Sequence, residues 1–488
     1  MASSSSTGPM GAPGGRMLNF PSMEKVKRYP PSLVETCLRK ISTGFLRFDP
    51  AVLQRELTRA KQLEEVYAIL DTDIPLGIAA TWIDDEYYWK RRTLQRDKGE
   101  YTGLVDQHGM SWKQFFCETE LGFIIEKFPL DFEAAELDEL KSIVQAVKQY
   151  IFCLKIREYP SHFDLALILD PLPNLCSLQI TYGRKRLGME YERGLFGMKI
   201  VDAQYLVRYV RCCQTLVKLS LPCNMIDDEL AKILMQGLET CLMLTDLDLS
   251  GNNLGDRGAR RLAKLLHRQY VLQTLDLSDN AIHANGCMHL GAHLAENSTL
   301  ETLNLRLNRC EDNGVCHLLQ DLCINKTLRN LNLSSNDLTW RCLAYLSSMI
   351  SENGTLEYLD LSANTLWNTE EGEETKELTD VSNLDPESPF GILVQCVSKN
   401  STLLSLDVRH CSLPEDLERR LHTITKHREL RSRGISVDAY ERAGLLLQQP
   451  VEEEKPAAAP ADGDDAEKKG TDESEENSAE EANKSAED

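Results

Sequence analysis

An asparagine recurs in the middle of this chain at an unvarying interval of 28 residues. The six copies are Asn224, Asn252, Asn280, Asn308, Asn336 and Asn364. Leucines stand at fixed distances around each copy, and the frame is clearest in Leu244, Leu247, Leu249, Asn252 and Leu254. A period held without slippage over six copies requires equivalent units stacked in a row, because each unit must bury the same leucines in the same way. The middle of the chain is therefore a repeat array.

The frame L-x-x-L-x-L-x-x-N-x-L is typical of leucine-rich repeats, in which each unit contributes one short strand and one return helix. Regular frames begin at Leu216, Leu244, Leu272, Leu300, Leu328, Leu356 and Leu403, and looser frames begin at Ile151 and Leu175. Alternation along a strand directs the leucines to one side, where they stack on the leucines of the next unit. The sequence therefore predicts an α/β solenoid, a horseshoe with parallel strands inside and helices outside.

The repeated asparagine predicts a structural hydrogen-bond ladder rather than an active site. Its amide both donates and accepts, so a buried copy can bond the backbone of its own unit and of the adjacent unit. In the last frame Cys411 takes the place of the asparagine, a replacement that these repeats allow. A second periodic set precedes x-Thr-Leu and consists of Asn297, Asn325, Asn353 and Asn400. We interpret this set as the turn from helix back to strand, where asparagine tolerates left-handed backbone geometry, rather than as glycosylation sites.

Charge and composition divide the rest of the chain. The net charge is −22, of which residues 451–488 contribute −11 and residues 370–387 contribute −7, so the remainder is close to neutral. The acidic C-terminal segment cannot bury enough apolar surface to fold. The predicted parts are a disordered lead at 1–30, a helical N-terminal domain at 31–145, a repeat domain at 146–433 with an acidic insertion at 367–386, a C-terminal helical extension at 434–450 and a disordered acidic tail at 451–488.

Neither a signal peptide nor an apolar run long enough to span a membrane is evident in the sequence. The fifteen cysteines form no paired metal-ligand pattern. We therefore expect reduced thiols in the cytoplasm, no bound metal and no membrane partner.

Catalytic motifs are also missing from the sequence, since it contains no phosphate-binding loop, nucleophile elbow or zinc-protease motif. We therefore expect neither an enzyme nor a cofactor. His289 and His293 stand four residues apart on an outer helix, with no third ligand nearby. A neighbouring outer helix carries Arg257, Arg260, Arg261, Lys264 and Arg268. Without interleaved aromatic residues they do not indicate nucleic-acid binding, and we interpret them as a solvated face, with an outer contact patch as the alternative.

The inner face of the predicted horseshoe is the candidate partner-binding surface. The residue between the second and third frame leucines points into the concavity, and most of these residues are polar or acidic. Two positions further on, two repeats carry arginine. The predicted partner-binding residues are Asp248, Asp276, Asn304, Arg306, Asn332, Asp360, Asp407 and Arg409. Because solenoids commonly use their concave surface for binding, we expect this groove to accept a basic helix or loop of a partner protein.

Two segments ahead of the repeats carry a family resemblance. Residues 74–89 read IPLGIAATWIDDEYYW and residues 108–116 read HGMSWKQFF. Together with repeat residues 227–233, 254–260 and 303–308, they resemble the dynein regulatory complex subunit 5 (T-complex-associated testis-expressed protein 1) family. The resemblance spans roughly residues 70–365, whereas the acidic insertion, the tail and the C-terminal end depart from the family pattern.

The resemblance implies a non-enzymatic subunit of the nexin–dynein regulatory complex in the axoneme of motile cilia and flagella. That complex links neighbouring doublet microtubules and regulates dynein-driven bending. The implied partners are other subunits of the complex, near inner-arm dynein and doublet microtubules.

Two other classes of protein remain open. A Ran-type GTPase-activating protein has similar repeats and an acidic tail, and Arg306 or Arg409 would act on the nucleotide. In that class, however, the repeats begin near the N-terminus, whereas about 145 residues precede them here. A ubiquitin-ligase adaptor with an F-box before its repeats is the third class, because residues 31–38, PSLVETCL, faintly resemble the start of such a box.

Overall fold

The structure is a computed structural model that describes residues 32–49, 60–97, 110–184, 196–268, 271–367 and 385–437, with the single positions 52, 53, 55, 57 and 105. The predicted lead and acidic tail lie outside the described residues, as do nearly all of the predicted insertion and most of the C-terminal extension. The chain divides into two compact units, Met1–Arg433 and Gly434–Asp488. All the helices and strands described below belong to the first unit.

Nine parallel strands form one sheet over the described residues, and each strand pairs with the next in chain order. They are β1 (Cys153–Tyr159), β2 (Ser177–Tyr182), β3 (Lys218–Ser220), β4 (Asp246–Asp248), β5 (Thr274–Asp276), β6 (Thr302–Asn304), β7 (Asn330–Asn332), β8 (Tyr358–Asp360) and β9 (Ser405–Asp407). The register places leucine opposite leucine, as for Leu247 and Leu275. The two looser frames form β1 and β2, with Leu154 opposite Leu178. The predicted α/β repeat solenoid is therefore confirmed.

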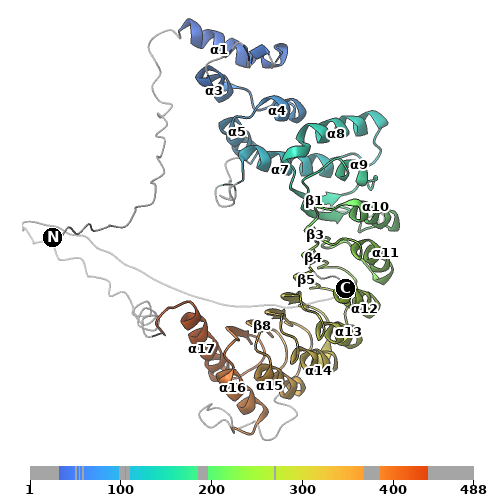
Figure 1. The fold of residues 1–488 in the computed structure, drawn as a ribbon, viewed down its shortest axis with the longest axis vertical. Coiled ribbons are helices and arrows are strands. Elements are labelled where there is room, and N and C mark those ends of the chain that lie inside the picture. Colours follow the sequence, from blue (N-terminus) through green and yellow to red (C-terminus); the bar gives the residue numbers. More distant parts are fainter. Residues whose placement is uncertain are drawn as a thin grey trace, which may run out of the picture. The chain divides into compact units, whose positions relative to one another are not determined.

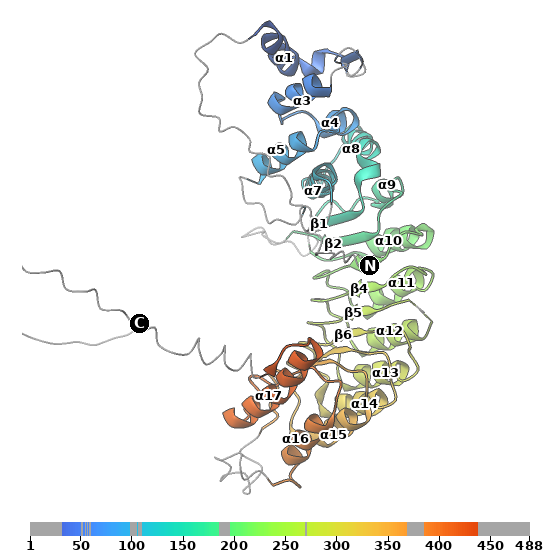
Figure 2. The same ribbon diagram turned by 60° about the vertical axis from the view of Figure 1, so that its left-hand side comes forward.

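A row of helices covers one side of this sheet. They are α9 (Ala166–Leu169), α10 (Ile200–Cys212), α11 (Asp228–Leu238), α12 (Asp256–Arg268), α13 (Ala284–Leu294), α14 (Glu311–Leu322), η4 (Trp340–Cys342), α15 (Leu343–Glu352) and α16 (Pro389–Lys399). Figures 1 and 2 show the strands along the inner side of the curved array and these helices along its outer side. Ala259 and Ala263 of α12 are fully buried, which lets that helix lie close to the sheet.

The first ladder, which consists of the six asparagines at 28-residue spacing, makes the bonds predicted for it. Asn280 Nδ2 donates to Leu249 O of the preceding repeat and to Leu277 O of its own, both at 3.0 Å. Its Oδ1 accepts from Leu254 N, also at 3.0 Å. In the last repeat, Cys411 Sγ lies 3.1 Å from Leu361 O and so occupies the position of the amide.

The second ladder, which consists of Asn297, Asn325, Asn353 and Asn400, lies at the other end of the strands. Asn325 Nδ2 donates to Leu294 O and Asn297 O in the preceding repeat, at 2.7 and 3.2 Å. Its Oδ1 accepts from Thr327 N and Leu328 N. The expected helix-to-strand turn is confirmed, but the expected left-handed geometry is wrong, since φ is −78° at Asn353. These asparagines are retained because their buried amides join neighbouring repeats.

Left-handed residues occupy a different position of the repeat. They stand one residue before the first-ladder asparagines, as at Gly251 (φ 65°) and Asp279 (φ 54°). At this position the chain turns away from the strand, so that the following asparagine points inward.

Helices precede the sheet in the N-terminal part of the chain. They are α1 (Leu33–Thr43), η1 (Phe45–Arg47), α3 (Ala60–Ile69), α4 (Leu76–Trp82), α5 (Glu86–Arg96), α7 (Trp112–Glu126), α8 (Ala134–Val147) and η2 (Lys148–Tyr150). The aromatic segment of the family resemblance lies in their interior. Trp89 and Tyr88 are fully buried, Trp89 Nε1 donates to Ile83 O at 2.9 Å, and the Trp89 ring packs against Phe116 of α7. The aromatic residues therefore form the core that holds α5 on α7.

A carboxylate on α7 completes the first edge of the sheet. In interior repeats, two successive N–H groups donate to one carbonyl of the preceding strand, as Thr245 and Asp246 do to Val217 O. Strand β1 has no preceding strand, and the N–H groups of Phe152 and Cys153 donate instead to Glu118 Oε1, at 2.9 and 3.0 Å. Glu118 therefore replaces a missing strand.

A guanidinium completes the other end of the array. Helix α17 (Glu415–Ser432) packs on β9 and forms the C-terminal end of the described repeat array. Arg428 stands 28 residues after Asn400 and donates to Val397 O, 31 residues upstream, at 2.6 Å, and to Leu403 O. The 31-residue span equals that of the Asn325 bond to Leu294 O, so Arg428 ends the second ladder.

Candidate partner-binding face

The strands bring the predicted polar column together as one continuous row on the inner face. Cα register places Asp248 opposite Asp276, and Asp276 opposite Asn304. The row then continues through Asn332 and Asp360 to Asp407. The side chains of all these residues are half-buried, and adjacent strands lie about 4.8 Å apart, so a bound segment would meet several of them at once.

Each side chain of this row also holds the turn that follows its own strand. Asp248 Oδ1 accepts from Ser250 N at 3.0 Å, and the same bond recurs two residues after each member of the row. The second oxygen bonds sideways: Asp248 Oδ2 accepts from Ser220 Oγ at 2.6 Å, and Asp360 Oδ2 accepts from Asn332 Nδ2 at 3.0 Å. These acids therefore support the fold, whether or not a partner also contacts them.

The two predicted arginines differ in their surroundings. The Arg409 guanidinium folds onto Asp407, with Nε 3.0 Å from both carboxylate oxygens. Partial burial raises the pKa of Asp407, but hydrogen bonds from Arg409 and its positive charge outweigh burial and lower that pKa below its ordinary value. Arg306 is exposed and forms no side-chain ion pair within the described residues. Of the two, Arg306 is the one whose charge is available to a partner.

A second row on the same face was missed from the sequence. This row lies two residues before the first row on each strand. The two rows share the inner face, because residues i and i+2 of a strand point to the same side. The members of the second row are Lys218, Asp246, Thr274, Thr302, Asn330, Tyr358 and Ser405. Tyr358 is 39% exposed and Lys218 is also exposed. The alternation rule alone would have identified this row. Tyrosine is enriched at protein interfaces, so Tyr358 is the best-placed anchor on the inner face.

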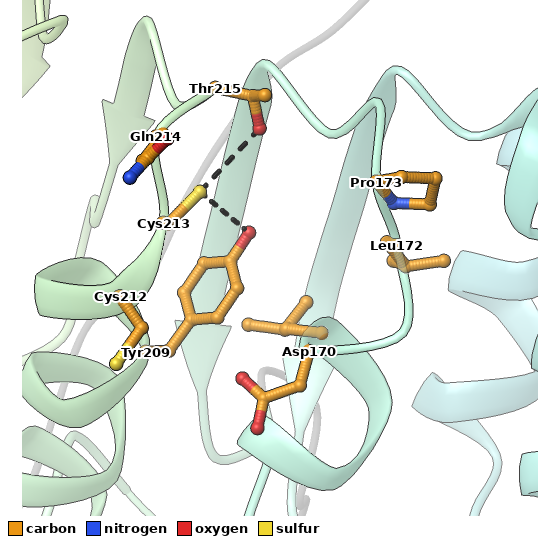
Figure 3. Close-up of a pocket in the computed structure, with 9 residues that line it drawn as sticks. Asp170, Leu172, Pro173, Tyr209, Cys212, Cys213, Gln214 and Thr215 are labelled. Atoms are coloured by element: carbon orange, nitrogen blue, oxygen red, sulfur yellow. Dashed lines mark hydrogen bonds between the residues drawn. The ribbon is translucent and has the colours of Figure 1, made fainter.

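A hollow of about 330 Å³ opens at the opposite edge of the strands, beside α10 (Figure 3). Cys213 points into it, with Sγ 3.3 Å from the Tyr209 hydroxyl and 3.6 Å from Thr215 Oγ1. Burial raises the pKa of this thiol, but hydrogen bonds from Tyr209, Thr215 and the backbone outweigh burial and lower it. Cys213 stands at the second-ladder position. Its sulfur accepts hydrogen bonds from the backbone N–H groups of Thr215 and Leu216, as Asn297 Oδ1 accepts from Thr299 N and Leu300 N in a later repeat. The hollow is therefore a gap in the second ladder.

Two negative findings apply to the described residues. They contain no group of three or more histidine, cysteine or acidic side chains arranged to hold a metal ion. Among the same residues, no helix is both long and apolar enough to cross a membrane. His289 and His293 lie on α13, where His293 Nδ1 bonds the His289 backbone carbonyl at 2.9 Å.

Comparison with known proteins agrees with the repeat architecture. A family model described as Leucine Rich repeat matches residues 240–263, 271–291 and 296–315. The leiomodin-1 actin-binding site 2 structure aligns with 32% of this chain and 80% of that chain, at 19% identity. The TM-score of this alignment is 0.24. Fold and family model together define the chain as a leucine-rich repeat protein.

Curated relatives indicate which family within that class the chain resembles. Proteins named Dynein regulatory complex subunit 5 from Chlamydomonas reinhardtii, Mus musculus and Homo sapiens are 36%, 29% and 31% identical over 174, 281 and 234 residues. These matches cover 36%, 48% and 43% of this chain, and 43%, 55% and 45% of the three relatives. The chain thus spans about half the length of the relatives that it matches. The predicted resemblance to the dynein regulatory complex subunit 5 family is confirmed.

Proposed function

We propose that this chain is a non-enzymatic subunit of a dynein regulatory complex in the axoneme of motile cilia and flagella. The observation that carries the proposal is that curated relatives from an alga and from two mammals share this name. In this role the repeat array is a scaffold that holds other subunits and helps to regulate dynein-driven microtubule sliding.

The inner face is the surface that we assign to subunit docking. It presents two polar rows on a sheet of nine strands, the exposed Tyr358 ring and the unpaired Arg306 charge. Aromatic residues and arginine are the residue types that contribute most binding energy at protein interfaces. The acids of the first row are poor test positions, because their substitution also breaks the turns described above.

Localisation tests the whole proposal. The full chain, tagged and expressed in a ciliated cell, should sit along the axoneme, remain after detergent extraction and co-purify with dynein regulatory complex subunits. Complete extraction by detergent, or absence from the axoneme, would overturn it.

Paired tyrosine variants test the docking face. Tyr358→Ala combined with Arg306→Glu should reduce axonemal retention by about tenfold, since interface anchors typically contribute 2 kcal/mol or more. Tyr345 lies on the outer helix α15 of the preceding repeat and is also 39% exposed, so Tyr345→Ala is the control for the tyrosine substitution. Equal retention of both variants would show that the inner face is not the docking surface.

The two rival classes have separate readouts. Stimulated GTP hydrolysis by a panel of small GTPases, lost in Arg306→Ala, would show a GTPase-activating protein instead of a scaffold. Co-purification with a ubiquitin-ligase core would identify the adaptor class.

A further inference from the structure

The outer surface of α12 carries four exposed basic side chains on one side of the helix. They are Arg257, Arg260, Arg261 and Lys264, which we call the basic face. Their spacing of three and four residues places them next to one another along the helix. The opposite side of α12 is buried against the sheet through residues such as Leu262. Figures 1 and 2 place α12 in the middle of the outer row of helices.

No member of the basic face forms an ion pair or a hydrogen bond through its side chain with any described residue. Other helices pair their cations with acids three or four residues away. Arg39 of α1 lies 3.1 Å from Glu35, and Arg419 of α17 lies 2.7 Å from Glu415. Helix α12 therefore departs from the arrangement that the protein uses elsewhere.

The acidic residue of α12, Asp256, accepts hydrogen bonds from the next helix instead of pairing with the basic face. Asp256 Oδ1 accepts from His283 N and Gly286 N at the start of the next helix, at 2.8 and 2.9 Å. Like charges three and four residues apart destabilise a helix, and Asp256, although it stands four residues before Arg260, forms no ion pair with the described members of the basic face. The fold keeps this repulsion although a single acidic residue per turn would remove it.

The unpaired positive charge of the basic face also affects a histidine on the neighbouring helix, α13. His289 lies on α13, which packs against α12. Burial is the largest cause that lowers the pKa of His289, and the positive charges of Arg260, His293 and Lys264 lower it further. The negative charge of Asp256 raises this pKa but does not outweigh them. The positive field of the basic face thus extends over α13.

The size of the basic face limits what it can bind. Seven residues separate its ends, so it is about 10 Å long. Side chains on one side of an extended peptide repeat every 6.6 Å or so, and two or three carboxylates would therefore lie over it. A nucleic acid is a poor fit, because the face holds four cations without an aromatic side chain and the chain as a whole carries −22.

We propose that the basic face binds an acidic, extended segment of a partner polypeptide. This contact lies on the outer helices and uses none of the residues assigned to the inner face, so it stands independently of the docking proposed above. Salt should weaken it strongly, because all four cations are exposed.

Binding of a fluorescein-labelled glutamate peptide of about ten residues to the full chain tests the proposal. Fluorescence anisotropy at low salt should show saturable binding, and a glutamine peptide of equal length should not bind. A variant with Gln at all four positions of the basic face should lose affinity by about tenfold or more. A matched variant with Gln at Lys326, Lys399, Arg420 and Arg431, which are exposed and scattered, should retain it within about twofold.

Three outcomes would overturn the proposal. One is equal binding of glutamate and glutamine peptides, and another is equal loss in the two quadruple variants, which would show an effect of net charge alone. The third is tighter binding of a short DNA duplex or of anionic vesicles than of the glutamate peptide. Both quadruple variants should melt at the temperature of the wild type, because all eight substituted residues are exposed. Equal melting temperatures would show that a loss of binding is not caused by unfolding.

Discussion

Glu118→Ala removes the one acceptor that, among the described residues, two N–H groups share at the first edge of the sheet. Phe152 N and Cys153 N both donate to Glu118 Oε1, and the Glu118 side chain is buried. Each unsatisfied buried donor costs about 1–3 kcal/mol. Removing the buried carboxylate also relieves its desolvation, so we expect a net loss of about 2–4 kcal/mol from the free energy of unfolding.

Urea unfolding measures this loss directly. The midpoint should fall while the slope with denaturant is unchanged, and hydrogen exchange should speed up first at the β1 amides. Glu139→Ala, at an exposed position of α8, is the matched control and should change neither. Wild-type exchange rates at β1 in Glu118→Ala would refute the assignment of Glu118 as a substitute strand.

Glu118→Gln separates the acceptor from its charge. Burial raises the pKa of Glu118 above its ordinary value of 4.5, although hydrogen bonds from the Cys153 and Phe152 backbone oppose the shift. A carboxyl with a raised folded-state pKa binds its proton more tightly in the folded chain. Its contribution is fully present below pH 4.5 and is lost as pH rises through the raised pKa. The stability of the wild type relative to Glu118→Gln should therefore fall with rising pH across that window, and parallel pH profiles would contradict the shift.

Other substitutions test the ladders and the C-terminal end. Asn325→Leu should lower the free energy of unfolding by about 2–5 kcal/mol, because a buried amide and its partners lose their bonds, and an unchanged urea midpoint would contradict this role. Arg428→Leu should lower the free energy of unfolding by roughly 2 kcal/mol, and Arg428→Lys should recover little of this loss, because one ammonium cannot make both bonds of the forked guanidinium. Equal melting temperatures of the lysine variant and the wild type would contradict this role. Cys241→Asn should stabilise the protein by about 1 kcal/mol in thermal melting, because Cys241 stands in the second-ladder position and its Sγ lies 3.9 Å from Leu216 O, 25 residues upstream, whereas the ladder bond spans 31 residues. A lower melting temperature would mean that the cysteine is retained for packing.

The 28-residue period was sufficient to predict the array, because it states which residues must stack and in which register. Leucine packing and asparagine bonding act between identical positions of adjacent repeats, so a local pattern fixes a long-range contact. The ends of the array follow no such rule. Glu118 and Arg428 replace a strand and an amide with other chemistry, and a pattern of residue identity cannot find them. The position of Arg428, 28 residues after Asn400, was nevertheless visible in the sequence.

The candidate site was predicted in part. Alternation placed Asp248 and its equivalents on the inner face, and the structure shows them there. Their hydrogen bonds to the following turn depend on backbone angles that a sequence pattern does not give. The aromatic segment of residues 74–89 carried the family resemblance, yet Tyr88 and Trp89 form a helical core instead of a contact surface.

The interval between the last two repeats has a consequence for how this protein can change. Leu359 pairs with Leu406 as other strands pair at 28-residue spacing, although 47 residues separate these two. Asn400 still donates to Ile350 O and Asn353 O, at 2.7 and 3.2 Å. The entropy of closing a chain segment grows only with the logarithm of its length, by about 0.6 kcal/mol for each doubling. The 19 residues by which this interval exceeds one repeat therefore leave the pairing of β8 and β9 unchanged at a small entropic cost, so this is the place in the array where the length of the chain can vary most readily.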